Sequence, residues 1–266
     1  MIPQWNKKFD DKLILKNLKK NLLQKNISQG KVTSKFESKV SKFLNVNYVV
    51  TVPSGTTGIL LALLSLNLKK NDEVIISDRA WISVLNAIKI LELKPVFVDV
   101  ENHKPVINIS KIRKKITKKT RVIIPVHMGG RGCNISKIKK IIKNKNIYII
   151  EDAAQAFGSM FNGKYLGTQS HIGCFSLSIA KTISSGQGGF VVTNNKNLYK
   201  KLIKLKNNGL IDIKNIFEWG NIGLNFKFND ILSTIALSEL NKFSYYKKKL
   251  INLYKFYNDK LKNQSQ

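Results

Sequence analysis

Long apolar runs are missing from this chain of 266 residues. No segment approaches the length of a membrane-spanning helix, and the N-terminal residues Met1 to Lys8 lack the apolar stretch of a signal peptide. We therefore expect a cytoplasmic protein with no membrane partner. The hydrophobic content of 43% still provides enough apolar side chains for one large globular domain with a substantial core.

Cysteine and histidine are also scarce. Cys133 and Cys174 are far apart in the sequence and lack the spacing of metal ligands, so we expect reduced thiols and no metal site. The histidines, His103, His127 and His171, do not cluster. We expect each of them to lie at the surface or to have its hydrogen bonds satisfied within the protein.

Acidic residues and arginine are few. The 16 Asp and Glu residues stand against 46 Lys and Arg residues, and the resulting net charge of +30 would ordinarily suggest nucleic acid as a partner. Arginine, the preferred residue for binding phosphates and base edges, occurs only at Arg79, Arg113, Arg121 and Arg131. The lysines lie on amphipathic patterns such as 137–145, which predict solvated helix faces. We favour a lysine-rich compositional bias and keep nucleic-acid binding as a less favoured alternative.

Apolar runs alternate with helical patterns along the chain, which predicts an α/β fold with a mostly parallel sheet flanked by helices. The expected strands are 48–52, 74–77, 95–100, 122–126 and 147–150, followed by shorter strands at 174–177 and 189–193. The expected helices are 57–66, 82–91, 109–117, 135–143, 196–208 and 229–261.

One lysine stands apart from the others. Between Tyr165 and Asn195, Lys181 is the only Lys, Arg, Asp or Glu residue. Apolar and small neighbours desolvate an amine, which lowers its pKa and frees it to attack a carbonyl group. Asp152 follows the apolar run 147–150, and a buried carboxylate needs a cationic partner such as the protonated ring nitrogen of pyridoxal phosphate. A Schiff-base lysine and a ring-pairing aspartate are the chemical minimum of a pyridoxal-phosphate enzyme.

The order of several motifs resembles the DegT/DnrJ/EryC1/StrS family of sugar aminotransferases, which have the aspartate aminotransferase (type I) fold. The resemblance extends over nearly the whole chain, through the segments 30–37, 54–57, 151–155, 174–181, 186–189 and 223–226. It implies that Lys181 holds the cofactor and moves the proton during transamination. It also implies that Asp152 keeps the cofactor ring nitrogen protonated.

The resemblance assigns further cofactor contacts. Gly55, Thr56 and Ser176 would bind the phosphate, Trp81 would stack on the ring, and Gln155 would contact the ring hydroxyl. The turn at 54–57 follows a predicted strand and opens a helix, where free N–H groups favour an anion. Other interpretations remain for these positions: an ordinary helix cap for the turn, a strand-end serine bonded to its own backbone, core packing for the tryptophan, and a surface glutamine.

Asn225 matches the family asparagine that reaches the cofactor phosphate of the neighbouring subunit, so the resemblance implies a homodimer with shared active sites. The chain departs from the family pattern next to it, where Phe226 replaces a tyrosine and Lys227 an arginine. Gln187 stands where the family has glutamate. These changes affect contacts near the subunit interface and on the substrate side. The aromatic residues nearby, Phe217, Trp219, Phe226 and Phe228, suit a buried subunit contact or a domain core.

Relatives in this family continue into a smaller C-terminal domain. We expect a large pyridoxal-phosphate-binding domain with its N-terminal segment over residues 1–242, and the start of a truncated second domain over 243–266. The sequence is compatible with a fragment of a longer protein and with a natural short form.

The functional hypothesis is a pyridoxal-phosphate-dependent aminotransferase that transfers an amino group from glutamate to a nucleotide-linked keto-sugar, for amino-sugar and polysaccharide biosynthesis. The resembled relatives that dehydrate sugars have histidine in place of the Schiff-base lysine, so Lys181 argues against that branch. A second hypothesis is a family member that binds the cofactor but is catalytically incomplete. The third is the basic nucleic-acid-binding protein.

Overall fold

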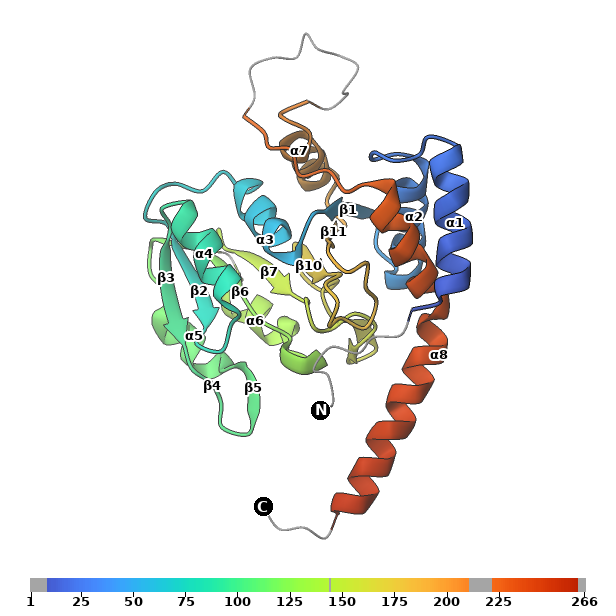
Figure 1. The fold of residues 1–266 in the computed structure, drawn as a ribbon. Coiled ribbons are helices and arrows are strands. Elements are labelled where there is room, and N and C mark those ends of the chain that lie inside the picture. The colour runs from blue at the N-terminus through green and yellow to red at the C-terminus, as the bar shows by residue number, and fades with distance from the viewer. Residues whose placement is uncertain (1–8, 144, 211–221, 263–266) are drawn as a thin grey trace.

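The computed structural model describes residues 9–143, 145–210 and 222–262. At its centre is a seven-stranded sheet with the strand order β1-β11-β10-β7-β6-β2-β3 (Figure 1). Its strands are β1 (Tyr48–Val52), β2 (Glu73–Ser77), β3 (Lys94–Val98), β6 (Thr120–Ile124), β7 (Tyr148–Asp152), β10 (Ile172–Ser176) and β11 (Gly189–Thr193). Two small hairpins lie outside this sheet: β4 (Val100–Glu101) with β5 (Lys104–Ile107), and β8 (Met160–Phe161) with β9 (Lys164–Tyr165).

The sheet is mostly parallel, as the sequence predicted. Strands β2, β3, β6, β7 and β10 pair in parallel, whereas β11 is antiparallel to both β1 and β10. The segment that links β10 to β11 contains no helix. Parallel neighbours are usually joined by a crossover helix, and this connection, which lacks one, returns β11 beside β10 in the antiparallel direction.

Helices cover both faces of the sheet. One face carries α3 (Gly55–Leu64), α4 (Ile82–Ile90) and α7 (Lys196–Lys206), which pack on Val50, Ile76, Ile124 and Val191. On the other face, α5 (Ile109–Lys115) and α6 (Ile135–Ile141) pack on β2, β6 and β7, while α2 (Lys31–Leu44) and α8 (Asp230–Leu261) pack on β1, β10 and β11. Helix α1 (Asp11–Leu23) lies against α8.

The N-terminal region contains two helices, α1 and α2, that were not among the predicted elements. Asp230 ties this region to α8. Its buried carboxylate accepts the backbone N–H groups of Gly30, Val32 and Thr33 at 2.9–3.1 Å. The first residue of α8 therefore satisfies the otherwise unpaired N–H groups at the start of α2.

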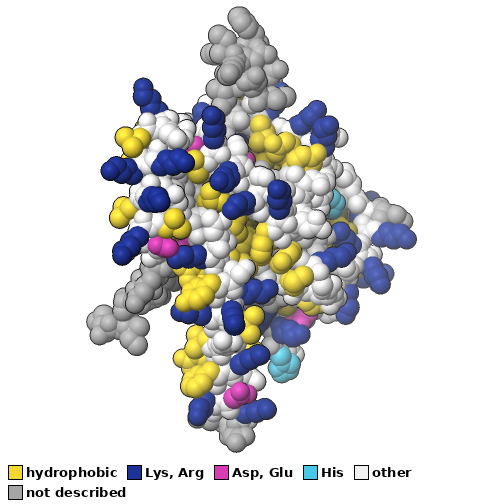
Figure 2. Space-filling model, turned by 90° about the vertical axis from the view of Figure 1, so that its right-hand side faces the viewer, with side chains coloured by type: hydrophobic (Ala, Val, Ile, Leu, Met, Phe, Trp, Pro, Cys, Tyr) yellow, Lys and Arg dark blue, Asp and Glu magenta, His cyan; other side chains and the backbone are white. Residues whose placement is uncertain are grey.

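Helix α8 is partly buried in its first half and exposed in its second half. Its buried residues end at Phe243, and the rest of the helix projects from the body (Figure 1). Hydrophobic side chains remain exposed along this projecting half, including Leu250, Leu253, Tyr254 and Tyr257 (Figure 2). None of the helices in the described ranges is both long and apolar enough to cross a membrane.

The aromatic residues near Asn225 that the structure describes belong to the domain core, one of the two predicted possibilities. Phe228 is 1% exposed and belongs to the core, and Phe226 packs against the core. Phe217 and Trp219 lie outside the described residues.

Candidate active site

The candidate site lies at the edge where the parallel strands end. Strand register places Val52, Gly189 and Ser176 side by side across β1, β11 and β10, and it places Cys174 beside Asp152 on β7. In α/β sheets the crevice outside the carboxyl ends of the strands is the usual place for a ligand. Asp152 is the last residue of its strand, two residues beyond the end predicted from the apolar run.

The turn between β1 and α3 brings unpaired N–H groups to this edge. The Ser54 and Thr57 side chains form a capping box at the start of α3. In the part of the chain that the structure describes, the N–H groups of Gly55 and Thr56 donate no hydrogen bond. The cap interpretation of this turn is correct, and it leaves two donors for an anion.

Close approach between this turn and β10 depends on two glycines. A Cβ atom on Gly55 would lie 3.0 Å from the Cβ atom of Ser176. One on Gly189 would lie 2.6 Å from the carbonyl oxygen of Phe175 and 2.7 Å from the carbonyl carbon of Ser54. The segment 186–189 therefore allows the backbone of the turn to lie directly against β10 and Ser176.

Three predicted site residues share one hollow of about 290 Å³. Gln155, Ser176 and Lys181 line it, together with Ala154, Phe157, Ala180 and Thr182. The Gln155 side chain is held by the N–H group of Gly129, which donates to its Oε1 atom at 2.8 Å. The fold thus brings together residues that are up to 26 positions apart (181 − 155).

Burial acts on both ionisable groups of the site. Asp152 is 4% exposed, and desolvation raises the pKa of its carboxyl group; the hydrogen bond from the Ala154 N–H group (3.0 Å) and the nearby Lys181 amine oppose this shift. Desolvation lowers the pKa of the Lys181 amine, and the charge of Asp152 opposes that shift. Burial therefore disfavours the charged form of each group, and a cation held beside Asp152 would oppose this effect on the carboxyl group.

The remaining predicted residues do not line this hollow. Thr56 and Asn225 are exposed, and Trp81 is 71% exposed at the N-terminal cap of α4. Core packing, the alternative interpretation of Trp81, is therefore wrong. The backbone of Asn225 forms an isolated antiparallel β-bridge with Asn207, the residue that follows the last residue of α7.

A buried pair beside Asp152 was not assigned a role from the sequence. His127 and Glu151 are completely buried, with 2.8 Å between His127 Nε2 and Glu151 Oε2. Cys133 N–H donates to His127 Nδ1 at 3.1 Å, so Nε2 carries the proton and donates to the carboxylate. Glu151 also accepts the N–H groups of Gly167 and Gln169 at 2.9 and 2.7 Å.

The alternation of side chains along β7 could have indicated this pair from the sequence. Consecutive strand residues point to opposite faces, so Glu151 had to point away from Asp152. His127 is a histidine whose hydrogen bonds are satisfied within the protein, one of the two outcomes expected for it. Its backbone N–H also donates to the Asp152 carbonyl oxygen at 3.0 Å.

The residues present fit pyridoxal phosphate. The free N–H groups of Gly55 and Thr56 beside Ser176 suit a phosphate, Lys181 suits the aldehyde carbon, and the buried carboxyl group of Asp152 suits a protonated ring nitrogen. Both cysteines are free and buried. Among the described residues, no group of three His, Cys, Asp or Glu side chains could hold a metal ion.

Comparison with known proteins agrees with this chemistry. The DegT/DnrJ/EryC1/StrS aminotransferase family matches residues 8–266. The chain is 38% identical over 231 residues to GDP-perosamine synthase of Escherichia coli O157:H7, a match that covers 86% of this chain and 63% of that protein. It is 32% identical over 215 residues to GDP-perosamine synthase of Vibrio cholerae, which covers 81% of this chain and 58% of that protein.

A solved structure shows the same architecture. GDP-4-keto-6-deoxymannose-3-dehydratase with a trapped PLP-glutamate geminal diamine superimposes with a TM-score of 0.92 and 26% identity, covering 98% of this chain and 73% of that one. The chain spans less than two thirds of the length of the two curated relatives described above.

Proposed function

The chain belongs to the DegT/DnrJ/EryC1/StrS aminotransferase family, and from this premise we propose that it is a pyridoxal-phosphate-dependent aminotransferase acting on a nucleotide-linked keto-sugar. The observation that carries the proposal is the hollow in which Lys181 meets Gln155 and Ser176, next to the buried Asp152. The product would be an amino sugar for polysaccharide biosynthesis.

Pyridoxal phosphate, when bound, supplies a ring that accepts the electrons released at the carbon that carries the amino group. Gly55 N–H, Thr56 N–H and the Ser176 hydroxyl would hold its phosphate at the start of α3, where the helix dipole favours negative charge. The Asp152 carboxylate would hold the proton on the ring nitrogen. Gln155, fixed by Gly129 N–H, would contact the ring hydroxyl, and Trp81 would cover one face of the ring.

Lys181 would have two roles at its Nζ atom. It would hold the cofactor covalently and, once displaced by the amino donor, carry the proton between the donor carbon and the cofactor. Both roles need a neutral amine, and desolvation lowers the pKa of Lys181 in this direction. Its position between Ala180 and Thr182, on the wall of the hollow, gives the amine access to the bound ring.

Glutamate is the proposed amino donor, and a GDP-linked keto-sugar is the proposed acceptor. Two relatives are named GDP-perosamine synthase, and the superimposed dehydratase holds a glutamate adduct of PLP. The lysine at position 181 favours amination over dehydration of the sugar.

The assembly and location of the chain are part of the same proposal. We place the protein in the cytoplasm, as a homodimer in which Asn225 of each chain serves the other chain's cofactor. Asn225 is exposed and does not line the Lys181 hollow of its own chain, which supports a role across the subunit interface. Residues 243–266 would begin a second, smaller domain, and the loss of burial after Phe243 supports that division.

Cofactor loading tests the central assignment. Protein incubated with pyridoxal phosphate should acquire a visible chromophore and a borohydride-reducible link at Lys181. Lys181→Ala should lose the link, whereas Lys164→Ala, which removes an exposed lysine of the β8–β9 hairpin, should keep it. A reducible link mapped to a different lysine would refute the assignment. Addition of glutamate to the loaded protein should then produce pyridoxamine phosphate; an unchanged chromophore would favour a cofactor-binding but catalytically incomplete family member.

A further inference from the structure

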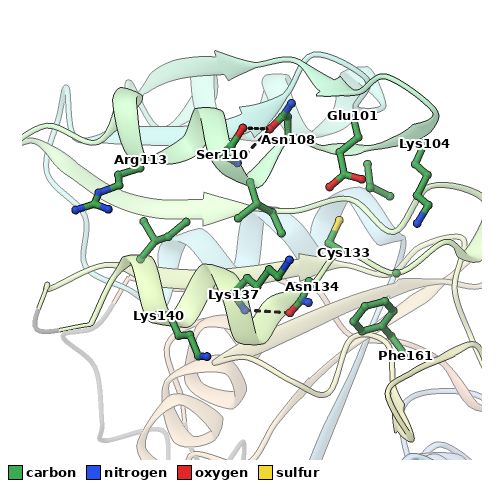
Figure 3. A pocket seen from close by; sticks show the side chains of 14 residues that line it. Glu101, Lys104, Asn108, Ser110, Arg113, Cys133, Asn134, Lys137, Lys140 and Phe161 are labelled. Atoms are coloured by element: carbon green, nitrogen blue, oxygen red, sulfur yellow. Dashed lines mark hydrogen bonds between the residues drawn. The ribbon is translucent and has the colours of Figure 1, made fainter.

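A second, larger hollow lies between α5, α6 and the β4–β5 hairpin (Figure 3). It measures about 880 Å³, against about 290 Å³ for the Lys181 hollow, and the two have no lining residue in common. Nothing in the proposed transamination uses it. Its volume lies within the range of sites that hold small molecules.

Positively charged side chains dominate the wall of this hollow. Four cationic side chains line the hollow, Lys104, Arg113, Lys137 and Lys140, against a single carboxylate, Glu101. In Figure 3, Lys104 and Lys137 point into the hollow from different walls, while Arg113 and Lys140 stand at its other end. None of these cations forms a salt bridge with a carboxylate of the described residues. An anion in the hollow would therefore gain charge pairs that the protein itself does not supply.

The other groups that line the hollow suit a ligand that carries both polar groups and a ring. Asn108 Oδ1 and Asn134 Oδ1 accept backbone N–H groups of α5 and α6, and their amide nitrogens donate no bond within the described part of the chain. Apolar side chains, Val106, Ile109 and Ile141, supply nonpolar contact. The walls thus combine hydrogen-bond donors with apolar surface, as small-molecule sites do.

Phe161 stands at one end of the hollow, and its place depends on a glycine. A Cβ atom on Gly132 would lie 2.8 Å from the Cβ atom of Phe161, so only glycine lets the aromatic side chain pack directly on this backbone. The face of an aromatic ring provides apolar contact for the flat C–H face of a sugar or for a base.

We propose that this hollow binds a small phosphorylated sugar, free or as part of a nucleotide. Lys104 and Lys137 contact the phosphoryl group, the ring of the ligand lies against Phe161, and Glu101 accepts a ring hydroxyl. Two lysines match the double charge of a phosphate monoester better than the single charge of a carboxylate. Arg113 and Lys140 offer a place for a second phosphoryl group.

Calorimetric titration of the full chain tests the phosphate contact. The probes are pyrophosphate, ribose 5-phosphate and a nucleoside 5′-monophosphate, and all three should bind. Lys104→Gln with Lys137→Gln should weaken each at least tenfold. The matched control, Lys12→Gln with Lys16→Gln, removes the same charge from the exposed face of α1 and should change binding less than twofold.

Equal losses in the two double variants would show nonspecific attraction to a basic protein and overturn the proposal. So would the absence of binding heat at about 5 mM probe. Loss of binding in Lys181→Ala, with the Lys104 and Lys137 variant unaffected, would assign the anion to the cofactor site and would also overturn it. None of these outcomes depends on transamination, so the test stands whether or not the proposed function holds.

Phe161→Ala separates ring recognition from charge. This variant should weaken ribose 5-phosphate and the nucleotide about fivefold or more while leaving pyrophosphate unchanged. A stronger effect on the nucleotide than on ribose 5-phosphate would identify the base as the group that contacts Phe161. An equal effect on pyrophosphate, or no effect on any probe, would refute the assigned role of this ring.

Discussion

Asp152 and Lys181 lie together in a site of low polarity, where burial disfavours the charged form of each. Desolvation raises the pKa of the carboxyl group and lowers the pKa of the amine. In the cofactor-free chain, an ionised Asp152 therefore destabilises the folded state, because no cofactor ring nitrogen is present to pair with it. This cost should be measurable, because it depends on pH and disappears when the carboxyl group is removed.

Asp152→Asn should stabilise the cofactor-free protein at pH 8 and have little effect at pH 4. Between 3.8, the ordinary carboxyl pKa, and the raised pKa of the native state, the folded chain binds the proton and the unfolded chain does not. The free energy of unfolding of the wild type therefore falls as pH rises through this window, and the penalty is complete above it. Thermal unfolding should show a higher midpoint for the variant than for the wild type at pH 8, and similar midpoints at pH 4.

The same substitution should weaken cofactor function, because an amide cannot hold the proton on the ring nitrogen. Glutamate-driven formation of pyridoxamine phosphate should fall at least 100-fold. A variant that is less stable than the wild type at pH 8 would contradict the electrostatic account of Asp152.

Gly189 offers a test of how the phosphate turn is held. An added methyl group would lie within 2.8 Å of Phe175 O, Ser54 C and Gly55 N, all of which are backbone atoms that cannot rotate away. Gly189→Ala should lower the free energy of unfolding by about 2–4 kcal/mol and weaken pyridoxal phosphate binding. Gly163→Ala is the control: its φ of +73° is unfavourable for alanine, but nothing lies within 4 Å, so only the backbone cost of about 1 kcal/mol should appear. Equal losses in denaturant titrations of the two variants would contradict the packing argument.

The sequence was informative about individual residues to different degrees. The isolation of Lys181 in a stretch without other charges correctly indicated a desolvated amine, because charge scarcity is visible in the sequence itself. The exposure of Trp81 and the position of Asn225 could not be derived, since they depend on where α4 begins and where α7 ends in space. The roles of the site residues stay predictions, whereas the family and the fold class are confirmed.

Among the elements, the strands of the central sheet were the easiest to predict. Continuous apolar runs gave β1 and β11 with their exact bounds and the other sheet strands within two residues at most of their ends. The hairpins β4–β5 and β8–β9 were missed because strands of two to four residues give no periodic signal. Helices α1 and α2 were missed although α2 has a clear apolar stripe, Phe36, Val40 and Leu44.

Helix α8 leads to a prediction about its projecting half. Deletion of residues 250–266 should change the thermal midpoint by less than about 2 °C, because the buried part of the helix ends at Phe243. Phe243→Ala is the contrasting change. Its ring is 4% exposed and packs edge-on against Phe43 and Phe157, so its loss should cost about 3–5 kcal/mol. A large loss of stability in the deletion variant would show that the exposed hydrophobic side chains of this half are covered in solution.

At the scale of the whole molecule, several candidate site residues remain exposed. Trp81, Thr56 and Asn225 are exposed around an edge at which Lys181, Gln155 and Ser176 already meet. Hydrophobic side chains are exposed beside two of these residues: Ile82 next to Trp81 at 55%, and Ile222 near Asn225 at 90%. A second copy of the chain, related by a two-fold axis, would cover such surfaces in both subunits at once.

Mixing two inactive variants tests whether the copies share their sites. Lys181→Ala and Asn225→Ala should each be inactive as pure dimers. In a mixed dimer one site carries both lesions and the other neither, so random exchange should restore about one quarter of wild-type sites. Pyridoxamine phosphate formed from glutamate is the readout, and each variant incubated alone under the same exchange conditions is the control. Sedimentation would detect the dimer directly. A monomer that performs this half-reaction at the full wild-type rate would refute sharing, because Asn225 of a single chain would then have to reach its own cofactor from the end of α7.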